Sequence, residues 1–284
     1  MPPRDHPTAR QVRLGTELRK LREAAGRTAR EAAGMLSVDQ AKISHIEAGR
    51  IGVSEDRVRR LCTYYECAAP ELIDALCEIA RERRGTLWFD EYRGVLAPSF
   101  LDIAELEHHA VELRSVQALT MPGLAQTENY ARALHSSAFP PLPPDETEER
   151  VAFRMRRTRI LQGEAPTPCT MLIHEAALRM RFGGREVARE QLFHLAELSR
   201  LPHITIRVIP FSTTEFIEAT QPTLLARGTI PQLDTVQIDS TFGGRLLDAP
   251  AELARYTTLI DVAEKASLPP DESRHLIHYI AREL

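Results

Sequence analysis

A short stretch of the chain, VDQAKISHIEAGR at residues 38–50, combines several side chains that can form hydrogen bonds. A glutamine amide can bond an adenine edge through two hydrogen bonds, and an alanine methyl can contact a thymine methyl. Serine and histidine add donors and acceptors, and lysine supplies a cation for a phosphate. These residue types suit the reading of base edges in duplex DNA. The side chains concerned are Gln40, Ala41, Lys42, Ser44 and His45.

This stretch predicts a helix too short to be stable alone. Only Ile43 and Ile46 are clearly apolar, and isolated helices shorter than about 12–15 residues are marginal in water. Asp39 is placed to cap its first free amides. We therefore expect neighbouring helices to bury the two isoleucines, which leaves the polar edge free.

The flanking sequence predicts that scaffold. Leu14, Leu18, Leu21 and Ala25 follow each other at helical steps of 4, 3 and 4, and Gly26 is a candidate terminator. In all, the pattern predicts five short helices between residues 10 and 84, with residues 1–9 as a flexible tail.

Cap residues define the remaining helix starts. Thr28 and Glu31 form a capping-box pattern for the second helix, in which Gly34 would permit a close helix crossing. A tight turn of two or three residues would join the second and third helices. Ser54 would cap the fourth helix, and Pro70 would lie in the first turn of the fifth.

Residues 13–65 resemble the Xre/lambda-repressor-like helix-turn-helix family. The resemblance rests on LGTELRKLREAAGRTAREAAGMLSVDQAKISHIEAGRIGVS, above all on the Lys42-to-Arg50 run KISHIEAGR. It implies a recognition helix that enters the major groove, in which Glu47 bonds a neighbouring helix instead of DNA. Ala29 stands where the family usually has a phosphate-gripping glutamine, so that contact is lost or passes to Arg30.

The predicted DNA contacts are of two kinds. Base contacts are assigned to four residues, Gln40, Ala41, Ser44 and His45. Phosphate contacts are assigned to Thr28, Arg30, Lys42 and Arg50. Two other interpretations remain open: the helices could form a protein-docking module, and Arg19, Arg22, Arg57 and Arg59 could be ordinary solvated charges.

Charge is unevenly distributed along the chain. Residues 1–60 carry 13 Lys and Arg against 8 Asp and Glu, a balance of +5, and the chain total of −4 leaves −9 for the rest. A basic N-terminal region (the head) followed by an acidic remainder (the body) favours binding of the head to a polyanion such as DNA. With 43% hydrophobic residues and no apolar run of membrane length, we expect a cytoplasmic, nucleoid-associated protein with no membrane contact.

The body, residues 85–284, mixes helical and strand-like segments. TMLI at 170–173, ITIRVIP at 204–210, TLLAR and TVQID predict strands. Helical spacing through Ile103, Leu106, Ala110 and Leu113 predicts a helix, and further helices are expected at 146–162, within 175–200, at 248–266 and at 270–284. The expected architecture is therefore multidomain: an all-α five-helix head followed by an α/β (α+β) domain with a small mixed sheet flanked by helices.

The body resembles the large C-terminal domain of actinobacterial WhiJ-type regulators. The matching pieces include Trp88-Phe89, MPGLAQTENYAR at 121–132, HEAALR at 174–179 and VIP at 208–210. The resemblance implies a transcription factor paired with a small protein encoded by an adjacent gene. Because one recognition helix reads only a few base pairs, we expect a homodimer on its operator, acting as a repressor. Two alternatives stay open for the body: a small-molecule sensor, or a toxin-like enzyme that the head autoregulates.

Patterns for catalysis or metal binding are weak in this sequence. Gly183-Gly184 and Gly243-Gly244 are bare pairs, more typical of turns than of phosphate loops, and His174-Glu175 lacks the second histidine of a zinc-protease helix. The four cysteines lack zinc spacing, and those on amphipathic helices read as core residues. Glu107 and Glu128 are candidates for buried polar anchors. We expect no catalytic residues, no metal site and no cofactor.

Overall fold

The computed structural model describes residues 7–82, 85–214, 221–240 and 243–284. Most of the tail expected at residues 1–9 lies outside these ranges. The chain forms two compact units, one of residues 1–106 with 229–233 and the other of residues 107–228 with 234–284. The boundary expected after residue 84 stays a prediction. Among the described helices, none combines the length and the apolar character needed to cross a bilayer.

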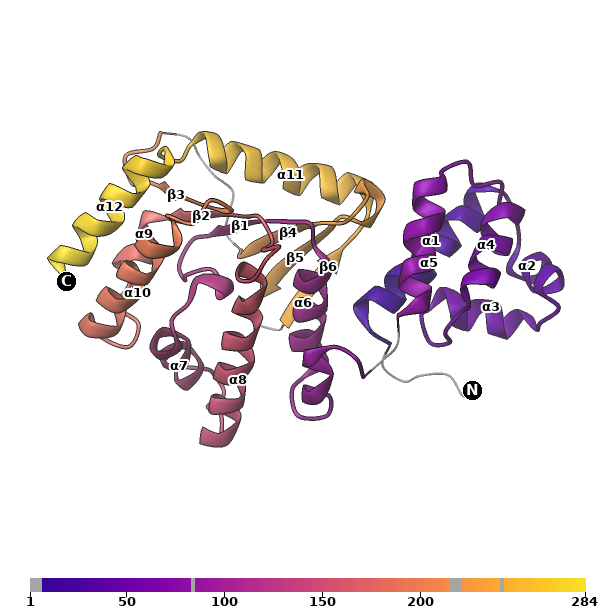
Figure 1. Ribbon diagram of the computed structural model, residues 1–284, viewed down its shortest axis with the longest axis horizontal. Helices are drawn as coiled ribbons and strands as arrows, with labels where there is room; N and C mark the ends of the chain where they lie inside the picture. The colour runs from indigo at the N-terminus through magenta and orange to yellow at the C-terminus, as the bar shows by residue number, and fades with distance from the viewer. Residues whose placement is uncertain (1–6, 83–84, 215–220, 241–242) are drawn as a thin grey trace. The chain divides into compact units, whose positions relative to one another are not determined.

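The first unit contains the five short helices that the sequence predicts (Figure 1). Thr28, Asp39 and Ser54 each accept a hydrogen bond from the backbone amide three residues on, so all three predicted caps are confirmed. Pro70 opens the fifth helix as expected. The helices are α1 (Ala9–Ala24), α2 (Ala29–Leu36), α3 (Gln40–Glu47), α4 (Glu55–Tyr64) and α5 (Pro70–Arg81).

The five helices share one apolar core. It includes Leu14 and Leu18 of α1, both isoleucines of α3, and residues of α4 and α5 such as Leu61 and Leu76. Cys62 and Cys77 are fully buried in it, as the sequence predicts for small core residues. After α5 this unit continues with η1 (Trp88–Tyr92) and the start of α6 (Pro98–His109).

The expected close helix crossing occurs at a different glycine. A Cβ on Gly34 would meet nothing within 4 Å, so the prediction for Gly34 is wrong. A Cβ on Gly15 of α1 would instead lie 2.4 Å from the carbonyl oxygen of Glu47 at the end of α3. A Cβ on Gly49, which has φ +71°, would lie 2.8 Å from the backbone nitrogen of Val12 in α1. The close approach therefore joins α1 to the C-terminal end of α3.

The second unit is built on a mixed sheet, as predicted. Its described strands are ordered β3-β2-β1-β4-β5-β6, with β1 parallel to β2 and β2 parallel to β3, and with the other neighbours antiparallel. The four strands predicted from sequence are present. The bounds are β1 (Glu112–Gln117), β2 (Cys169–His174), β3 (Ile204–Ile209), β4 (Thr223–Arg227), β5 (Thr235–Ser240) and β6 (Gly243–Leu247).

Two strands depart from the sequence prediction. The helix expected through Leu113 ends at His109, and β1 begins at Glu112 in the centre of the sheet. Gly243-Gly244, read as a turn, opens the edge strand β6. Both segments lack a run of apolar residues, so their strand character depends on pairing with neighbours and could not be seen locally.

Helices cover both faces of this sheet (Figure 1). On one face, Val116, Leu225 and Val236 share a core with Ile260 and Ala263 of α11. Helices α7 and α8 lie on the other side. The remaining described helices and turns are η2 (Gly123–Ala125), α7 (Glu128–Ser136), α8 (Pro144–Arg157), η3 (Thr158–Leu161), α9 (Glu175–Arg179), α10 (Arg185–Leu198), η4 (Pro231–Leu233), α11 (Pro250–Lys265) and α12 (Pro270–Glu283).

The two predicted polar anchors differ in their surroundings. Glu107 is 2% exposed and accepts two hydrogen bonds from Arg157, which confirms its role. The prediction that Glu128 is a buried anchor is wrong, because its side chain is 60% exposed and pairs with Arg132 at the surface. The N-terminal turn of a helix favours acidic side chains through its dipole, which accounts for Glu128 without burial.

Candidate nucleic-acid interface

The candidate interface begins with the turn between α2 and α3. Ser37 adopts the left-handed conformation at φ 54°, and it ends α2. Asp39 then accepts a 2.6 Å hydrogen bond from the amide of Lys42 and starts α3. This turn of three residues, 37–39, agrees with the predicted length. The cap and the turn together define where the N-terminal end of α3 emerges.

The apolar side of α3 is held by the core of the first unit. Ile43 is 1% exposed and Ile46 is 2% exposed. Complete burial of an isoleucine side chain contributes about 1.5–3 kcal/mol, so two of them hold a helix that could not form alone. The expectation that neighbours support this short segment is confirmed.

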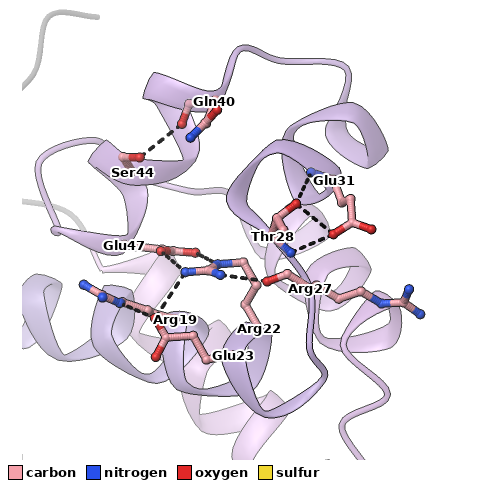
Figure 2. A network of polar contacts seen from close by, with 9 residues as sticks. All are labelled: Arg19, Arg22, Glu23, Arg27, Thr28, Glu31, Gln40, Ser44 and Glu47. Atoms are coloured by element: carbon pink, nitrogen blue, oxygen red, sulfur yellow. Dashed lines mark hydrogen bonds and ion pairs between the residues drawn. The ribbon is translucent and has the colours of Figure 1, made fainter.

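An ion pair fixes the C-terminal end of α3 to α1 (Figure 2). Arg22 donates from Nε to Glu47 Oε1 at 2.6 Å and from Nη2 to Oε2 at 3.0 Å. Its Nη1 also donates to the carbonyl oxygen of Arg27 at 2.8 Å. The hydrogen bond to Glu47 raises the pKa of Arg22 above its usual value, although burial opposes the shift. Glu47 is therefore structural, as the family resemblance implies.

The predicted base-contacting residues lie on one edge of α3. Gln40, Ala41 and Ser44 are exposed, and His45 is partly exposed. Gln40 and Ser44 are one turn apart, and the Ser44 hydroxyl donates to the Gln40 carbonyl oxygen at 3.3 Å (Figure 2). That bond uses backbone oxygen, so the Gln40 amide keeps its full capacity for hydrogen bonds. Their contact with bases stays a prediction.

The predicted phosphate-contacting residues lie at the start of α2, within α3 and just after α3. Thr28 is exposed. Its hydroxyl donates a hydrogen bond to the Glu31 carboxylate and accepts one from the Glu31 backbone amide (Figure 2). Arg30 and Arg50 are exposed and Lys42 is partly exposed. Within the described parts of the chain, these three cationic side chains make no hydrogen bond or ion pair. They are available to an external anion, although their contact with phosphate is also a prediction.

Three of the four arginines that could be ordinary solvated charges have partners, whereas the side chain of Arg57 has none among the described residues. Arg19 pairs with Glu23, and Arg59 pairs with Glu55 and Asp74, so both are surface charges with partners. Reading Arg22 as a solvated charge was wrong, because it is 9% exposed and tied to Glu47. Its position four residues after Leu18, on the apolar stripe of α1, is the signal that identifies it as an inward-facing residue.

Comparison with known families matches two regions of the chain. Residues 13–76 match a family profile described as a helix-turn-helix domain. Residues 100–279, more than half of the chain, match one described as a domain of unknown function (DUF5753). No curated protein and no solved structure gives a match. The first match covers most of α1, all of α2 to α4 and the first part of α5, and it supports a DNA-binding regulator.

Proposed function

Because the chain belongs to the family described as a domain of unknown function (DUF5753) and carries a helix-turn-helix domain, we propose that it is a sequence-specific transcriptional repressor. One observation supports this most directly. Helix α3 exposes Gln40, Ala41 and Ser44 while burying both of its isoleucines. A helix held in this way can enter the major groove with its N-terminal end first.

The need for sequence specificity favours a repressor that binds DNA as a homodimer. One recognition helix reads only a few base pairs, and each good base contact contributes about 1–3 kcal/mol. Two copies on half-sites about 34 Å apart would double the readout. The operator would then be a palindrome that reflects the symmetry of the dimer.

The second unit would receive the signal that controls DNA binding. We infer that the signal is a small protein encoded next to this regulator, an inference that rests on the resemblance to WhiJ-type regulators. A small-molecule signal is the second candidate, and it is favoured by two buried polar atoms of the second unit, Ser115 Oγ and Gln237 Oε1, that have no hydrogen-bond partner among the described residues. An enzymatic body is not part of this proposal.

Substitution of Gln40 tests the assignment of base readout. Gln40→Ala should relax the preference for one base position in each half-site, because it removes about 1–3 kcal/mol of discrimination there. Selection of bound sequences from a random pool measures this directly. Gln162→Ala, at an exposed glutamine of the second unit, is the matched control. An unchanged site preference in Gln40→Ala would remove this residue from the interface.

Substitution of Arg30 tests the phosphate contacts. Arg30→Ala should weaken binding to every sequence about equally and reduce the slope of log affinity against log salt by about 1. Arg200→Ala removes an exposed arginine of the second unit and controls for overall charge. If both variants have the salt slope of the unmodified protein, Arg30 does not touch phosphate.

A further inference from the structure

The first unit includes one segment that lies far along the chain from its helices. Residues 229–233 join β4 to β5, yet they group with residues 1–106. Ile230 and Leu233 of this segment are partly buried and pack against the apolar core that the five helices share. Connections between strands usually run over the surface of a protein. This one instead takes part in the packing of the helix-turn-helix region.

The segment is held in shape by its own neighbours in the sequence. Asp234, which is 5% exposed, accepts hydrogen bonds from Arg227 Nη1 at 2.6 Å and from the amide of Gly228 at 2.9 Å. The amide of Leu233 donates to the carbonyl oxygen of Ile230 at 2.9 Å. A preformed segment loses little conformational entropy when it packs. Because Arg227 ends β4 and Asp234 directly precedes β5, the segment also follows the positions of these two strands.

A hydrogen bond joins the segment to α1. Arg13 of α1 donates from Nη2 to the backbone carbonyl oxygen of Gln232. Arg13 is 9% exposed, and its Nε lies 3.0 Å from Oε1 of Glu17, which is 6% exposed. Hydrogen bonds from charged donors are stronger than those between neutral groups. The Gln232 carbonyl therefore anchors the Arg13 side chain of α1 to the segment.

The same turn of α1 carries the close contacts with α3. A Cβ on Gly15 would lie 2.4 Å from the Glu47 carbonyl oxygen, and one on Gly49 would lie 2.8 Å from the Val12 nitrogen. Arg13 lies between Val12 and Gly15 in the sequence. Closely packed backbones transmit strain to each other and do not shift independently. A displacement of this turn of α1 would therefore displace the C-terminal end of α3 and change the angle of its polar edge.

We propose that residues 229–233 position α3 for DNA through Arg13, and that β4 and β5 act on DNA binding through this contact. Arg13 and residues 229–233 are positioning residues, which act without touching a base or a phosphate. A signal that changes the spacing or direction of β4 and β5 would move the segment and so change the affinity of α3 for its operator. The inference rests on the proposed function for its effect on DNA, whereas the coupling of the segment to α3 can be measured without DNA.

Hydrogen exchange of the full chain, without DNA, tests this coupling. Ile230→Ala removes most of an apolar side chain from the core, and it should raise the exchange rate of the α3 amides about fivefold because α3 opens more often. The α12 amides of the second unit should exchange at the unmodified rate. Gln232→Ala is the matched control, since its side chain is exposed and the contact with Arg13 uses only the backbone carbonyl, which the substitution keeps.

A second variant tests the link to the strands. Asp234→Asn removes the charge that pairs with Arg227 and leaves Ile230, Leu233 and Arg13 in place. It should raise the exchange rate of the α3 amides at least threefold, while the amides of α4 and α5 exchange as before. A segment that only fills the core would respond to Ile230→Ala and not to Asp234→Asn.

DNA binding is then measured with the same variants. Fluorescence anisotropy on the sequence that the unmodified protein selects should show at least tenfold weaker binding for Ile230→Ala and at least threefold weaker binding for Asp234→Asn. Gln232→Ala should bind as the unmodified protein does. The preferred sequence should be the same in all variants, because the base-contacting residues are intact, and circular dichroism at the temperature of the measurement verifies that each variant is folded.

Several results would overturn this proposal. Unchanged exchange of the α3 amides in Ile230→Ala would show that the segment does not position α3, whatever happens to DNA binding. A response to Ile230→Ala without one to Asp234→Asn would contradict the link to β4 and β5. Normal DNA affinity in Ile230→Ala, with altered exchange, would separate the segment from DNA binding. If the exchange responds as expected but the unmodified protein binds no duplex DNA, the proposed function fails, and the positioning of α3 by the segment stands.

Discussion

The Arg22–Glu47 ion pair shows how one contact sets the position of the candidate recognition helix. Both side chains are about nine-tenths buried, and two hydrogen bonds join them at 2.6 and 3.0 Å. Such a pair adds little net stability compared with apolar residues, but removal of one member leaves a buried charge uncompensated. The pair therefore acts mainly on the geometry of α1 and α3.

Neutralisation of Glu47 should destabilise the first unit. We expect Glu47→Gln to lower the free energy of unfolding by about 3 kcal/mol, because the buried Arg22 then keeps only the exposed Glu23, at 3.5 Å, as an opposite charge. Urea denaturation followed by circular dichroism measures this. Glu23→Gln is the control, since Glu23 contacts the same arginine from an exposed position and should have no measurable effect. Equal effects of the two substitutions would contradict the structural role of Glu47.

His135 of α7 predicts a pH dependence of stability. Burial, followed by repulsion from Arg154, Arg150 and Arg157, lowers its pKa to about 4. In the unfolded chain this histidine has its ordinary pKa of about 6.5. Between about pH 4 and pH 6.5 the unfolded chain therefore binds more protons at His135 than the folded chain does. Stability from this group is complete above about pH 6.5 and is lost as the pH falls towards 4.

Replacement of His135 isolates this contribution. His135→Gln should flatten the rise of unfolding free energy between about pH 4 and 6.5, measured by urea denaturation at a series of pH values. Solvent screening of the partly exposed ring limits the effect to at most about 2 kcal/mol. His275→Gln on the exposed side of α12 is the matched control. An identical pH profile in His135→Gln and the unmodified protein would refute the lowered pKa.

At the scale of elements, the approach of α1 to the end of α3 is set by glycine. The backbone of Glu47 lies where a side chain on Gly15 would have to be, with only 2.4 Å to its carbonyl oxygen. Backbone atoms cannot move aside as a flexible side chain can. This contact thus determines the angle at which α3 presents its polar edge.

Substitution of two helical glycines should have opposite effects. Gly15→Ala should destabilise the first unit by about 2 kcal/mol or more through overpacking, and it should weaken DNA binding because α3 is displaced. The Cβ that Gly34→Ala adds would have no neighbouring atom within 4 Å. The substitution should therefore stabilise α2 by up to about 1 kcal/mol through the higher helix propensity of alanine. Thermal unfolding and a gel-shift titration measure both. A stable Gly15→Ala protein with normal DNA affinity would show that the close contact is dispensable.

At the scale of the whole molecule, the proposed dimer makes a prediction about DNA geometry. Two half-sites with centres about 34 Å apart should bind far more tightly than one half-site, and a shift of the spacing by half a helical turn should abolish this gain. Fluorescence anisotropy with three DNA duplexes compares the cases, while analytical ultracentrifugation reports the mass of the complex. Equal affinity for one and two half-sites would argue for a monomer.

The helices of the first unit were predictable because their signals are local. Thr28, Asp39 and Ser54 each carry a capping oxygen, and the amide they cap lies three residues on, as observed. The apolar spacing of Ile43 and Ile46 was sufficient to show which side of α3 is buried. Local chemistry of this kind needs no knowledge of distant residues.

The sheet was only partly predictable, because strand signals depend on neighbours. β2 and β3 are rich in apolar and β-branched residues, and they were identified. β1 has the sequence ELRSVQ and β6 has GGRLL, which lack that signal. β1 becomes a central strand because β2 and β4 pair with it on both sides. No local pattern records that pairing.

The sequence by itself determined that a short, capped helix has a buried apolar side and a polar edge suited to DNA, since residue type and helical spacing are local properties. The tertiary structure alone decided which charges face inward. Arg22 and Arg154 resemble surface arginines in the sequence, yet Arg22 is paired with Glu47 and Arg154 donates to the side-chain amide of Gln126. Burial and the identity of a partner arise when distant segments meet, so only the folded chain reveals them.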